Sequence, residues 1–294
     1  MAGVHSKQNP ESYSMLSISL LGYAMSISML TVHYLAISDY HKFLFTVLHV
    51  PSFYILGLFP CFPHKKILYC ANFLGYCTAF GVIIAKWSAL YSSFGWYIIF
   101  MSLFHYLEFL TTALTNPKNL SVDSYLLNHS MEYGIAAVAS WVEYATEAWY
   151  SPGLKYFNTL GVSGLGVLIC IFGDCLRKMA MFHAGKGFNH IVQEEKSEEH
   201  ELVKYGVFSV IRHPSYLGWY LFSLGTQLIL CNPLCFTAYV IVIWMFFNER
   251  IYEEEFYLYR FFGKEYTKYQ FMVPHTGIPF IKGYTQARRD YSQY

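Results

Sequence analysis

A polar segment stands directly before an apolar run in "VIRHPSYLGWYLFSLGTQ", residues 210–227. Because proline lacks an amide proton and is tolerated in a first helical turn, Pro214 predicts a helix that begins near residues 213–215. The free backbone amides at a helix start attract anions, and the cation Arg212 adds to that attraction. The segment therefore predicts a site for a carboxylate or a phosphate. Alternatively, Arg212 and His213 only anchor the helix at a membrane surface.

The residues before this helix alternate between polar, apolar and aromatic types, as a site for a small polar cofactor with a planar base requires. They include Gln193, His200, Leu202, Val203, Gly206 and Phe208. His200 and Glu201 do not begin an HExxH zinc motif, because residue 204 is lysine, and a zinc protease is therefore excluded. A single histidine at an interface is more often structural, so the prediction depends on the whole set.

A second polar cluster lies in "NERIYEEEFYLYR", residues 248–260. Arg250 is followed by Glu253 and Glu254 at three- and four-residue spacing, which predicts that the three side chains share one helical face. Glu255 is expected to point elsewhere and to be solvated. The cluster is explained either as an ion-pair ladder where a helix leaves the membrane or as part of a site. Because the two clusters bracket one short helical pair, a shared site is favoured.

The elements that position these clusters are predicted to be membrane helices. Hydrophobic residues make up 55% of the 294-residue chain and charged residues 13%, which lies outside the range of ordinary soluble domains. Several uncharged runs approach or exceed the ~20 residues of a spanning helix. We predict an all-α integral membrane protein with about eight transmembrane helices, over residues 14–37, 43–60, 67–90, 93–115, 131–149, 156–182, 215–231 and 234–260.

The last two helices are predicted to form a hairpin. The segment "LCNPLC", around Asn232 and Pro233, divides one long apolar stretch into two halves. The first half is marginal for a full crossing at ~1.5 Å per residue, so the hairpin is expected to be shallow. The charged residues of the second half of the chain fall mainly in residues 174–212 and 249–290. A cytosolic cofactor pocket is therefore expected at this hairpin.

Two further features bear on the membrane arrangement. The Lys and Arg residues favour cytosolic positions for both termini. Glu143 and Glu147 interrupt the helix predicted at residues 131–149, and such carboxylates are costly within lipid, so they are expected near the headgroup boundary. The first apolar run shows no small-residue cleavage pattern and is interpreted as a spanning helix rather than a removable signal peptide.

Several other functions are disfavoured. The formal net charge of +1 gives no reason to expect nucleic-acid binding. The seven cysteines form neither a CxxC pair nor a scaffold spacing, so no zinc site and no disulfide are predicted. Gly161, Gly164 and Gly166 lie in an apolar run without a preceding strand, and they are interpreted as small residues for close helix packing rather than as a nucleotide loop.

Taken in order, these motifs resemble the isoprenylcysteine carboxyl methyltransferase family. The RHPxYxG element alone is shared with related membrane methyltransferases and, loosely, with sterol reductases. The full set is more specific, and it covers residues 183–283 densely. It comprises "NHIVQEEK", His200, Leu202, Val203, Gly206, the "RHPSYLG" turn, "GTQ", "CNP", the Arg250 to Glu255 cluster, "FFGKEYTKY" and "VPHTGIPFIKG".

The resemblance implies methyl esterification of the C-terminal prenylcysteine of CaaX-processed proteins, with S-adenosylmethionine as cofactor and no metal. It implies that Arg250 binds the substrate carboxylate and acts in catalysis. The family often has tyrosine where this chain has Phe208, so ring stacking is kept and a hydroxyl contact is in question. The implied cofactor residues are Gln193, His200, Glu201, Leu202, Val203, Phe208, His213, Pro214, Ser215, Tyr216 and Glu254.

The resemblance also implies partners, a location in the cell and separate roles for the two parts of the chain. The partners are farnesylated or geranylgeranylated protein C-termini, such as those of small GTPases, together with membrane lipid, and the location is the endoplasmic reticulum membrane. Within one membrane domain, residues 14–182 are expected to form the scaffold and the prenyl groove. Residues 183–294 are expected to form the cytosol-facing methyltransferase core around the hairpin 215–260.

Two alternatives stay open at this level. A phospholipid N-methyltransferase would share the cofactor and the hairpin, but an amine acceptor would not call for Arg250 beside it. A non-enzymatic transporter or scaffold would place charged residues along a pathway through the membrane. The concentration of charged residues in two blocks, rather than along the spans, disfavours the transporter.

Overall fold

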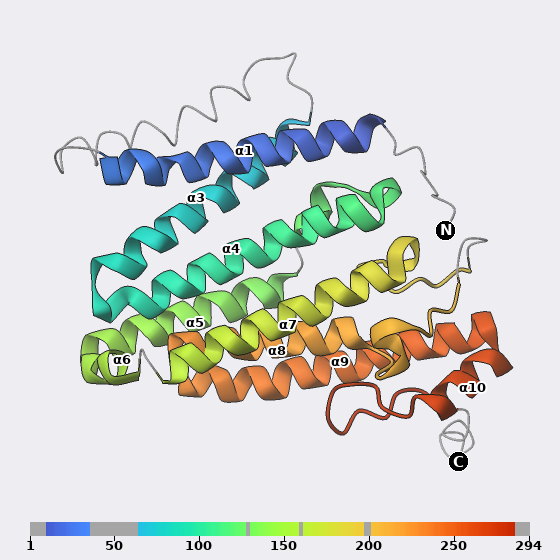
Figure 1. Ribbon diagram of the computed structural model, residues 1–294. Helices are drawn as coiled ribbons and strands as arrows, with labels where there is room; N and C mark the ends of the chain where they lie inside the picture. Colours follow the sequence, from blue (N-terminus) through green and yellow to red (C-terminus); the bar gives the residue numbers. More distant parts are fainter. Residues whose placement is uncertain (1–9, 36–63, 128–129, 159–160, 197–200, 286–294) are drawn as a thin grey trace. The chain divides into compact units, whose positions relative to one another are not determined.

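The computed structural model describes residues 10–35, 64–127, 130–158, 161–196 and 201–285, and within these ranges it is helical, with short 3-10 turns and no strand (Figure 1). The predicted helix 43–60 lies outside the described residues. The α-helices are α1 Pro10–Leu35, α3 Lys65–Trp87, α4 Ala89–Thr115, α5 Met131–Tyr150, α6 Pro152–Asn158, α7 Val162–Ala184, α8 Pro214–Leu230, α9 Pro233–Phe262 and α10 Lys264–Met272.

Three of the described helices, α3, α4 and α9, are long and apolar enough to cross a membrane. They coincide with the predicted helices 67–90, 93–115 and 234–260. The prediction of one continuous helix over residues 156–182 is wrong, because α6 ends at Asn158 and α7 begins at Val162. Residues 159–160 lie outside the described residues, and Gly161, which has a low helix propensity, lies in a turn just before α7. The short polar helix α10 was not predicted.

The chain divides into two compact units, and the first comprises the residues up to Gly164 together with Ile229–Cys231. Its core is formed where α1 and α4 pack against α3, and Tyr125 closes one end. The Tyr125 ring stacks on Phe109 at a centroid distance of 4.2 Å, and its hydroxyl donates to Ser19 Oγ at 2.8 Å. Other buried members of this core are Ile18, Ile67, Leu68, Ala71, Leu74, Tyr106, Ala113 and Leu120.

A buried ion pair accounts for one of the two carboxylates within α5. Glu147 accepts from Nζ of Lys155 at 2.5 Å, and the Lys155 side chain is fully buried. The same ammonium donates to the carbonyl oxygens of Leu230 and Cys231 at 2.9 and 3.1 Å, so it also caps the last turn of α8. Because the Lys155 ammonium binds a carboxylate and two helix-terminal carbonyl oxygens, the free-energy cost of burying its charge is reduced.

The second unit comprises Leu165–Leu228 and Asn232–Tyr294. In it, α7 and α8 approach closely at Gly173 and Gly218: a Cβ atom built on Gly173 would lie 2.6 Å from the carbonyl oxygen of Gly218. No described atom lies within 4 Å of a Cβ built on Gly161 or Gly164, so the prediction of close packing at these two residues is not tested by the described part of the chain. Gly166 does take part in a close approach, since its carbonyl lies 2.9 Å from a Cβ built on Gly225.

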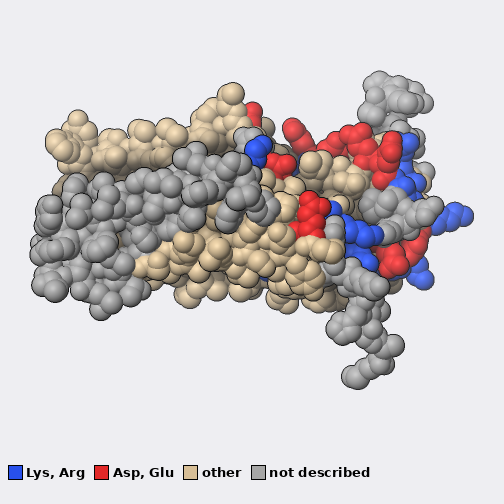
Figure 2. Space-filling view, turned by 90° about the horizontal axis from the view of Figure 1, so that it is seen from above, with Lys and Arg blue, Asp and Glu red and all other residues tan. Residues whose placement is uncertain are grey.

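Helices α8 and α9 pack side by side in the second unit (Figure 1). The Tyr220 hydroxyl donates to the carbonyl of Val240 at 3.4 Å, and Trp219 contacts the Phe247 ring edge-on at a centroid distance of 6.2 Å. On the face drawn in Figure 2, described Lys and Arg side chains lie close to described Asp and Glu side chains. This distribution agrees with the charge blocks 174–212 and 249–290 of the sequence.

Candidate active site

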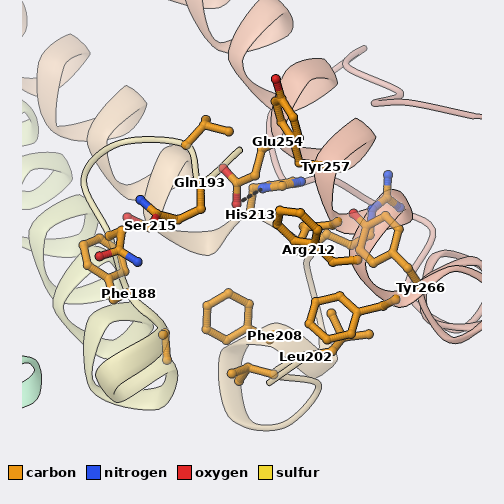
Figure 3. A pocket seen from close by; sticks show the side chains of 18 of the residues that line it. Phe188, Gln193, Leu202, Phe208, Arg212, His213, Ser215, Glu254, Tyr257 and Tyr266 are labelled. Atoms are coloured by element: carbon orange, nitrogen blue, oxygen red, sulfur yellow. Dashed lines mark ion pairs between the residues drawn. The ribbon is translucent and has the colours of Figure 1, made fainter. Parts of the chain in front are cut away.

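A cavity of about 170 Å³ opens in the second unit between the segment that precedes α8, the start of α8, the end of α9 and α10 (Figure 3). Every predicted cofactor residue that the structure describes lines it, whereas His200 lies outside the described residues. These predicted lining residues are Gln193, Glu201, Leu202, Val203, Phe208, His213, Pro214, Ser215, Tyr216 and Glu254. The structure therefore brings together residues from three separated stretches of the chain.

The start of α8 forms one wall of the cavity. The helix begins at Pro214, which confirms the prediction made from the proline. The preceding backbone is tied to a distant loop, since the amides of Arg212 and His213 donate to the carbonyls of His275 and Thr276 at 3.0 and 2.9 Å. The first turn of α8 is thus held in place while its own free amides face the cavity region.

Arg177 of α7 supports this turn and was missed in the sequence. Its guanidinium donates from Nη1 to Ser215 Oγ at 2.7 Å, and the residue is only 2% exposed. The guanidinium carbon lies 4.7 Å from the ring centroid of Trp219 and 5.7 Å from that of Phe188, which are cation–π distances. An arginine inside a predicted membrane helix is itself a functional signal, and it could have pointed to this residue.

The prediction that Glu255 is solvated is wrong. Its side chain is fully buried and accepts from Nε of Arg212 at 2.7 Å. Its second carboxylate oxygen accepts from Gln270 Nε2 at 3.1 Å and from the amide of Tyr284 at 2.8 Å. Burial of a carboxylate requires a charge partner and hydrogen bonds, and Glu255 has both. The pattern of helix spacing alone could not distinguish it from Glu254.

Arg212 lines the cavity, but its guanidinium is hydrogen-bonded within the protein, so its support of an anion site stays a prediction. Besides Glu255, its guanidinium donates to the carbonyls of Val273 at 2.7 Å and Lys282 at 3.1 Å. Its donors are thus directed to other parts of the protein, and its side chain is 3% exposed. Arg212 fastens the segment after α10 to the start of α8.

His213 connects the buried pair to the cavity. Its Nε2 lies 3.0 Å from the carboxylate of Glu255, while Nδ1 lies 3.8 Å from that of Glu254 (Figure 3). An ionised carboxylate only accepts hydrogen bonds, so the contact with Glu255 requires a proton on Nε2. Glu255 therefore sets the orientation of the imidazole ring and leaves Nδ1 directed toward Glu254.

Tyr216 joins Glu254 to Arg250. Its hydroxyl donates to the carboxylate of Glu254 and lies 3.4 Å from Nε of Arg250, which donates to it. The Tyr216 ring stacks on His213 at a centroid distance of 5.6 Å. Arg250 also donates from Nη2 to the carbonyl of His190 at 2.9 Å. Arg250 and Glu254 both contact Tyr216 and so lie on one side of α9, as their four-residue spacing predicts. Glu253, which was expected on the same face, is exposed.

Aromatic rings form the remaining walls, and most of them were not predicted. Tyr269 holds the Phe208 segment, since its hydroxyl donates to the Phe208 carbonyl at 2.7 Å. Burial raises the pKa of the Tyr266 hydroxyl well above its usual value, so this group stays neutral at physiological pH. The unpredicted aromatic residues around the cavity are Phe188, Tyr257, Phe261, Phe262, Tyr266 and Tyr269. All of them except Phe188 come from the aromatic-rich stretch 256–271, which is visible in the sequence.

The described residues offer no cluster of three or more His, Cys, Asp or Glu side chains that could hold a metal ion. The described cysteines are free thiols: Cys70, Cys77, Cys170, Cys175, Cys231 and Cys235. The polar residues that line the cavity include Asn189, Gln193, Glu201, Arg212, His213, Ser215 and Glu254. Such a set suits an organic ligand with both positive and negative groups.

Comparison with known proteins identifies the family. Residues 166–260 match the profile of the isoprenylcysteine carboxyl methyltransferase (ICMT) family. The chain is 51% identical over 221 residues to a human protein-S-isoprenylcysteine O-methyltransferase, covering 75% of this chain and 77% of the relative. The chain belongs to this family. The corresponding Xenopus laevis protein is 52% identical over 213 residues, covering 72% of this chain and 73% of the relative.

A solved structure supports the same assignment for the fold. It is described as the structure of the eukaryotic intramembrane Ras methyltransferase ICMT, and it matches with a TM-score of 0.85 at 42% identity. The match covers 94% of this chain and 99% of the other. The predicted family and the prediction of an all-helical membrane protein are therefore confirmed.

Proposed function

We propose that this chain transfers a methyl group from S-adenosylmethionine to the C-terminal carboxylate of a prenylated cysteine, as a protein-S-isoprenylcysteine O-methyltransferase. The names of its relatives support this activity. The observation that carries the proposal for this chain is the cavity itself. It joins the cofactor residues expected from the sequence, and Arg250 lies beside it, connected through Tyr216 to Glu254.

The lining residues fit the chemically different parts of S-adenosylmethionine. The rings of Phe208 and Phe188 suit a planar adenine base. The carboxylate of Glu254 and the amide of Gln193 suit the positively charged groups, and the free amides at the start of α8 suit a carboxylate. When bound, this cofactor supplies a methyl group on a positively charged sulfur. The fit supports the cofactor without any metal ligand.

The acceptor in this proposal needs no general base. A C-terminal carboxyl group has a reference pKa of about 3.3–3.7, so it is already ionised at neutral pH. What the protein supplies is alignment and exclusion of water, and proximity of this kind is worth ~7–11 kcal/mol. The planar fork of Arg250 can hold one carboxylate oxygen while the other stays free to react. The contacts to Tyr216 and His190 fix the direction of that fork.

The location at a membrane boundary follows from the substrates. A prenyl chain gains ~0.8 kcal/mol per buried methylene-sized group and stays in lipid, while the methyl donor is dissolved in water. In α9 the exposed apolar residues come first, and the charges begin at Glu249, close to Arg250. The hairpin of α8 and α9 therefore suits a pocket at the cytosolic surface, with a prenyl groove among residues 14–182 and the methyltransferase core in residues 183–294.

The remaining parts of the proposal concern partners and location. The substrates are farnesylated or geranylgeranylated C-termini of processed proteins, small GTPases among them, presented from the membrane lipid. The enzyme lies in the endoplasmic reticulum membrane with both termini in the cytosol. Family membership and the distribution of Lys and Arg support this arrangement.

The decisive experiment is a radiolabelled methyl transfer assay on the purified full-length chain. One reaction contains a small farnesylated cysteine derivative with a free carboxylate, and a matched reaction contains the same compound as its methyl ester. A third contains a phospholipid with an amine headgroup. We expect label only in the first. Label in the phospholipid would instead establish an N-methyltransferase, and no label with no saturable binding of S-adenosylhomocysteine would support a non-enzymatic role.

A further inference from the structure

The segment after α10 turns back along α9 and carries an exposed phenylalanine (Figure 1). The carbonyl of Pro279 accepts from the indole nitrogen of Trp244 at 2.8 Å, which holds the tip of this loop beside α9. The next residue, Phe280, is 93% exposed. A single exposed aromatic residue is not unusual by itself, so the case rests on what surrounds and holds Phe280.

The contact with Trp244 shows which part of α9 lies beside the loop tip. The first charged residue of α9 is Glu249, five residues after Trp244, which is ~7.5 Å further along the axis. The α9 residues before that charge carry exposed apolar side chains, among them Leu234, Ile241, Val242, Met245 and Phe246. The Pro279–Phe280 tip is therefore held beside the apolar part of a helix that is long and apolar enough to cross a membrane.

The loop is held firmly on both sides of its tip. Ile278 and Ile281 are 2% and 5% exposed, and they pack into one cluster with Phe247 and Ile251 of α9. Thr276 donates from Oγ1 to the carbonyl of Ile281 at 2.7 Å, which closes the loop on itself. Phe280 thus projects from a rigid support, and its exposure does not come from a loose chain.

The backbone of Phe280 adds an independent observation. Its φ angle is +66°, in the left-handed region that a large aromatic residue rarely adopts. Asparagine or glycine would accept this backbone conformation more readily than phenylalanine. An unfavourable conformation that directs an aromatic ring outward is consistent with a gain from its surroundings. The exposed Lys282 follows two residues later.

We propose that the loop Gly277–Ile281 is a membrane anchor in which Phe280 inserts into the acyl-chain boundary of the bilayer and Lys282 faces the phosphate headgroups. An aromatic residue followed by a cation is the arrangement that favours a membrane interface. The loop is joined to the site by Arg212 and Glu255, which bind the backbone of Lys282 and Tyr284. The anchor therefore sets the depth of the cavity relative to the membrane surface.

The test is lipid photocrosslinking of the full-length chain in phosphatidylcholine vesicles, with p-benzoylphenylalanine placed at Phe280. Phe246 on the exposed apolar face of α9 serves as the positive control, and the exposed Lys268 on α10 serves as the aqueous control. We expect lipid adducts at position 280 at about the level found at position 246, and about tenfold above position 268. Adducts at position 280 no more frequent than at position 268 would overturn the anchor.

A second measurement avoids dependence on the photoreactive residue. In vesicles with brominated acyl chains, Phe280→Trp adds a fluorophore that bromine quenches within lipid, and Lys268→Trp is the matched control. We expect the added fluorescence to be lost for Phe280→Trp and kept for Lys268→Trp. Equal fluorescence of the two variants would contradict the anchor. Because neither measurement requires methyl transfer, a negative result here is distinguishable from failure of the proposed activity.

Discussion

The carboxylate of Glu255 lies 2.7 Å from Nε of Arg212, and both side chains are almost completely buried. The pair joins the C-terminal half of α9 to the segment just before α8, and its further contacts hold the segment after α10. His213, the next residue, contacts the same carboxylate at 3.0 Å. The shape of the candidate site therefore depends on an ion pair of which Arg212 lines the cavity and Glu255 lies behind it.

Glu255→Ala should strongly destabilise the protein. Removal of one member of a buried ion pair leaves the other charge uncompensated, which costs about 3–5 kcal/mol. The exposed Glu253→Ala should change the free energy of unfolding by about 0.5 kcal/mol or less. Thermal unfolding of both variants in the same detergent measures the difference. Equal stability of the two variants would refute the structural role of the pair.

Arg250→Lys should keep the fold and the affinity for S-adenosylhomocysteine while methyl transfer to the prenylcysteine falls by about 100-fold. The lysine keeps the charge but lacks the planar fork, and losing one charged hydrogen bond costs about 1.5–3 kcal/mol. Calorimetric binding and initial rates measured on one preparation separate the two effects. Near-normal turnover by this variant would remove Arg250 from the proposed role.

Tyr216→Phe tests whether the hydroxyl between Glu254 and Arg250 orients the arginine. The ring and its stacking on His213 remain, so cofactor affinity should change little. The turnover number should fall by about 10- to 100-fold, which corresponds to about 1.5–3 kcal/mol for a hydrogen bond to a charged group. Tyr220→Phe is a matched control one turn later on α8, and it should stay close to the parent. A fall in cofactor affinity without a change in turnover would contradict the assignment.

His213→Ala and Glu254→Ala should weaken binding of the cofactor more than binding of the prenyl substrate. Both side chains line the cavity, and His213 is directed toward Glu254 by the contact with Glu255. Separate titrations with S-adenosylhomocysteine and with a methylated prenylcysteine measure the two affinities. If both ligands are weakened equally, the division between a cofactor side and a substrate side is incorrect.

Phe208→Ala should weaken cofactor binding through the loss of base stacking. Alanine substitution of a stacking ring costs about 1–3 kcal/mol per base, or about 5- to 150-fold in the dissociation constant. Phe208→Tyr keeps the ring and should bind the cofactor at least as well as the parent chain. An unchanged affinity in Phe208→Ala, with the fold intact by circular dichroism, would exclude this ring from the adenine site.

The sequence by itself determined the helical membrane character, the start of α8 and ten of the residues that line the cavity. These features are local: apolar runs predict spans, Pro214 predicts a helix start, and a four-residue spacing brings Arg250 and Glu254 to one side of a helix. The order of the motifs added the family, because "NHIVQEEK", "RHPSYLG" and the glutamate cluster occur together in one chain.

Only the tertiary structure decided which charges are buried and what they bind. Glu254 and Glu255 are adjacent and chemically alike, and the partner that buries Glu255 lies 43 residues away in Arg212. Arg177 reaches Ser215 across 38 residues, and the loop near Phe280 reaches Trp244 across 35. The free energy of a buried charge depends on these distant partners, which helix spacing cannot supply. The contacts between helices therefore determined the roles of Arg212 and Glu255.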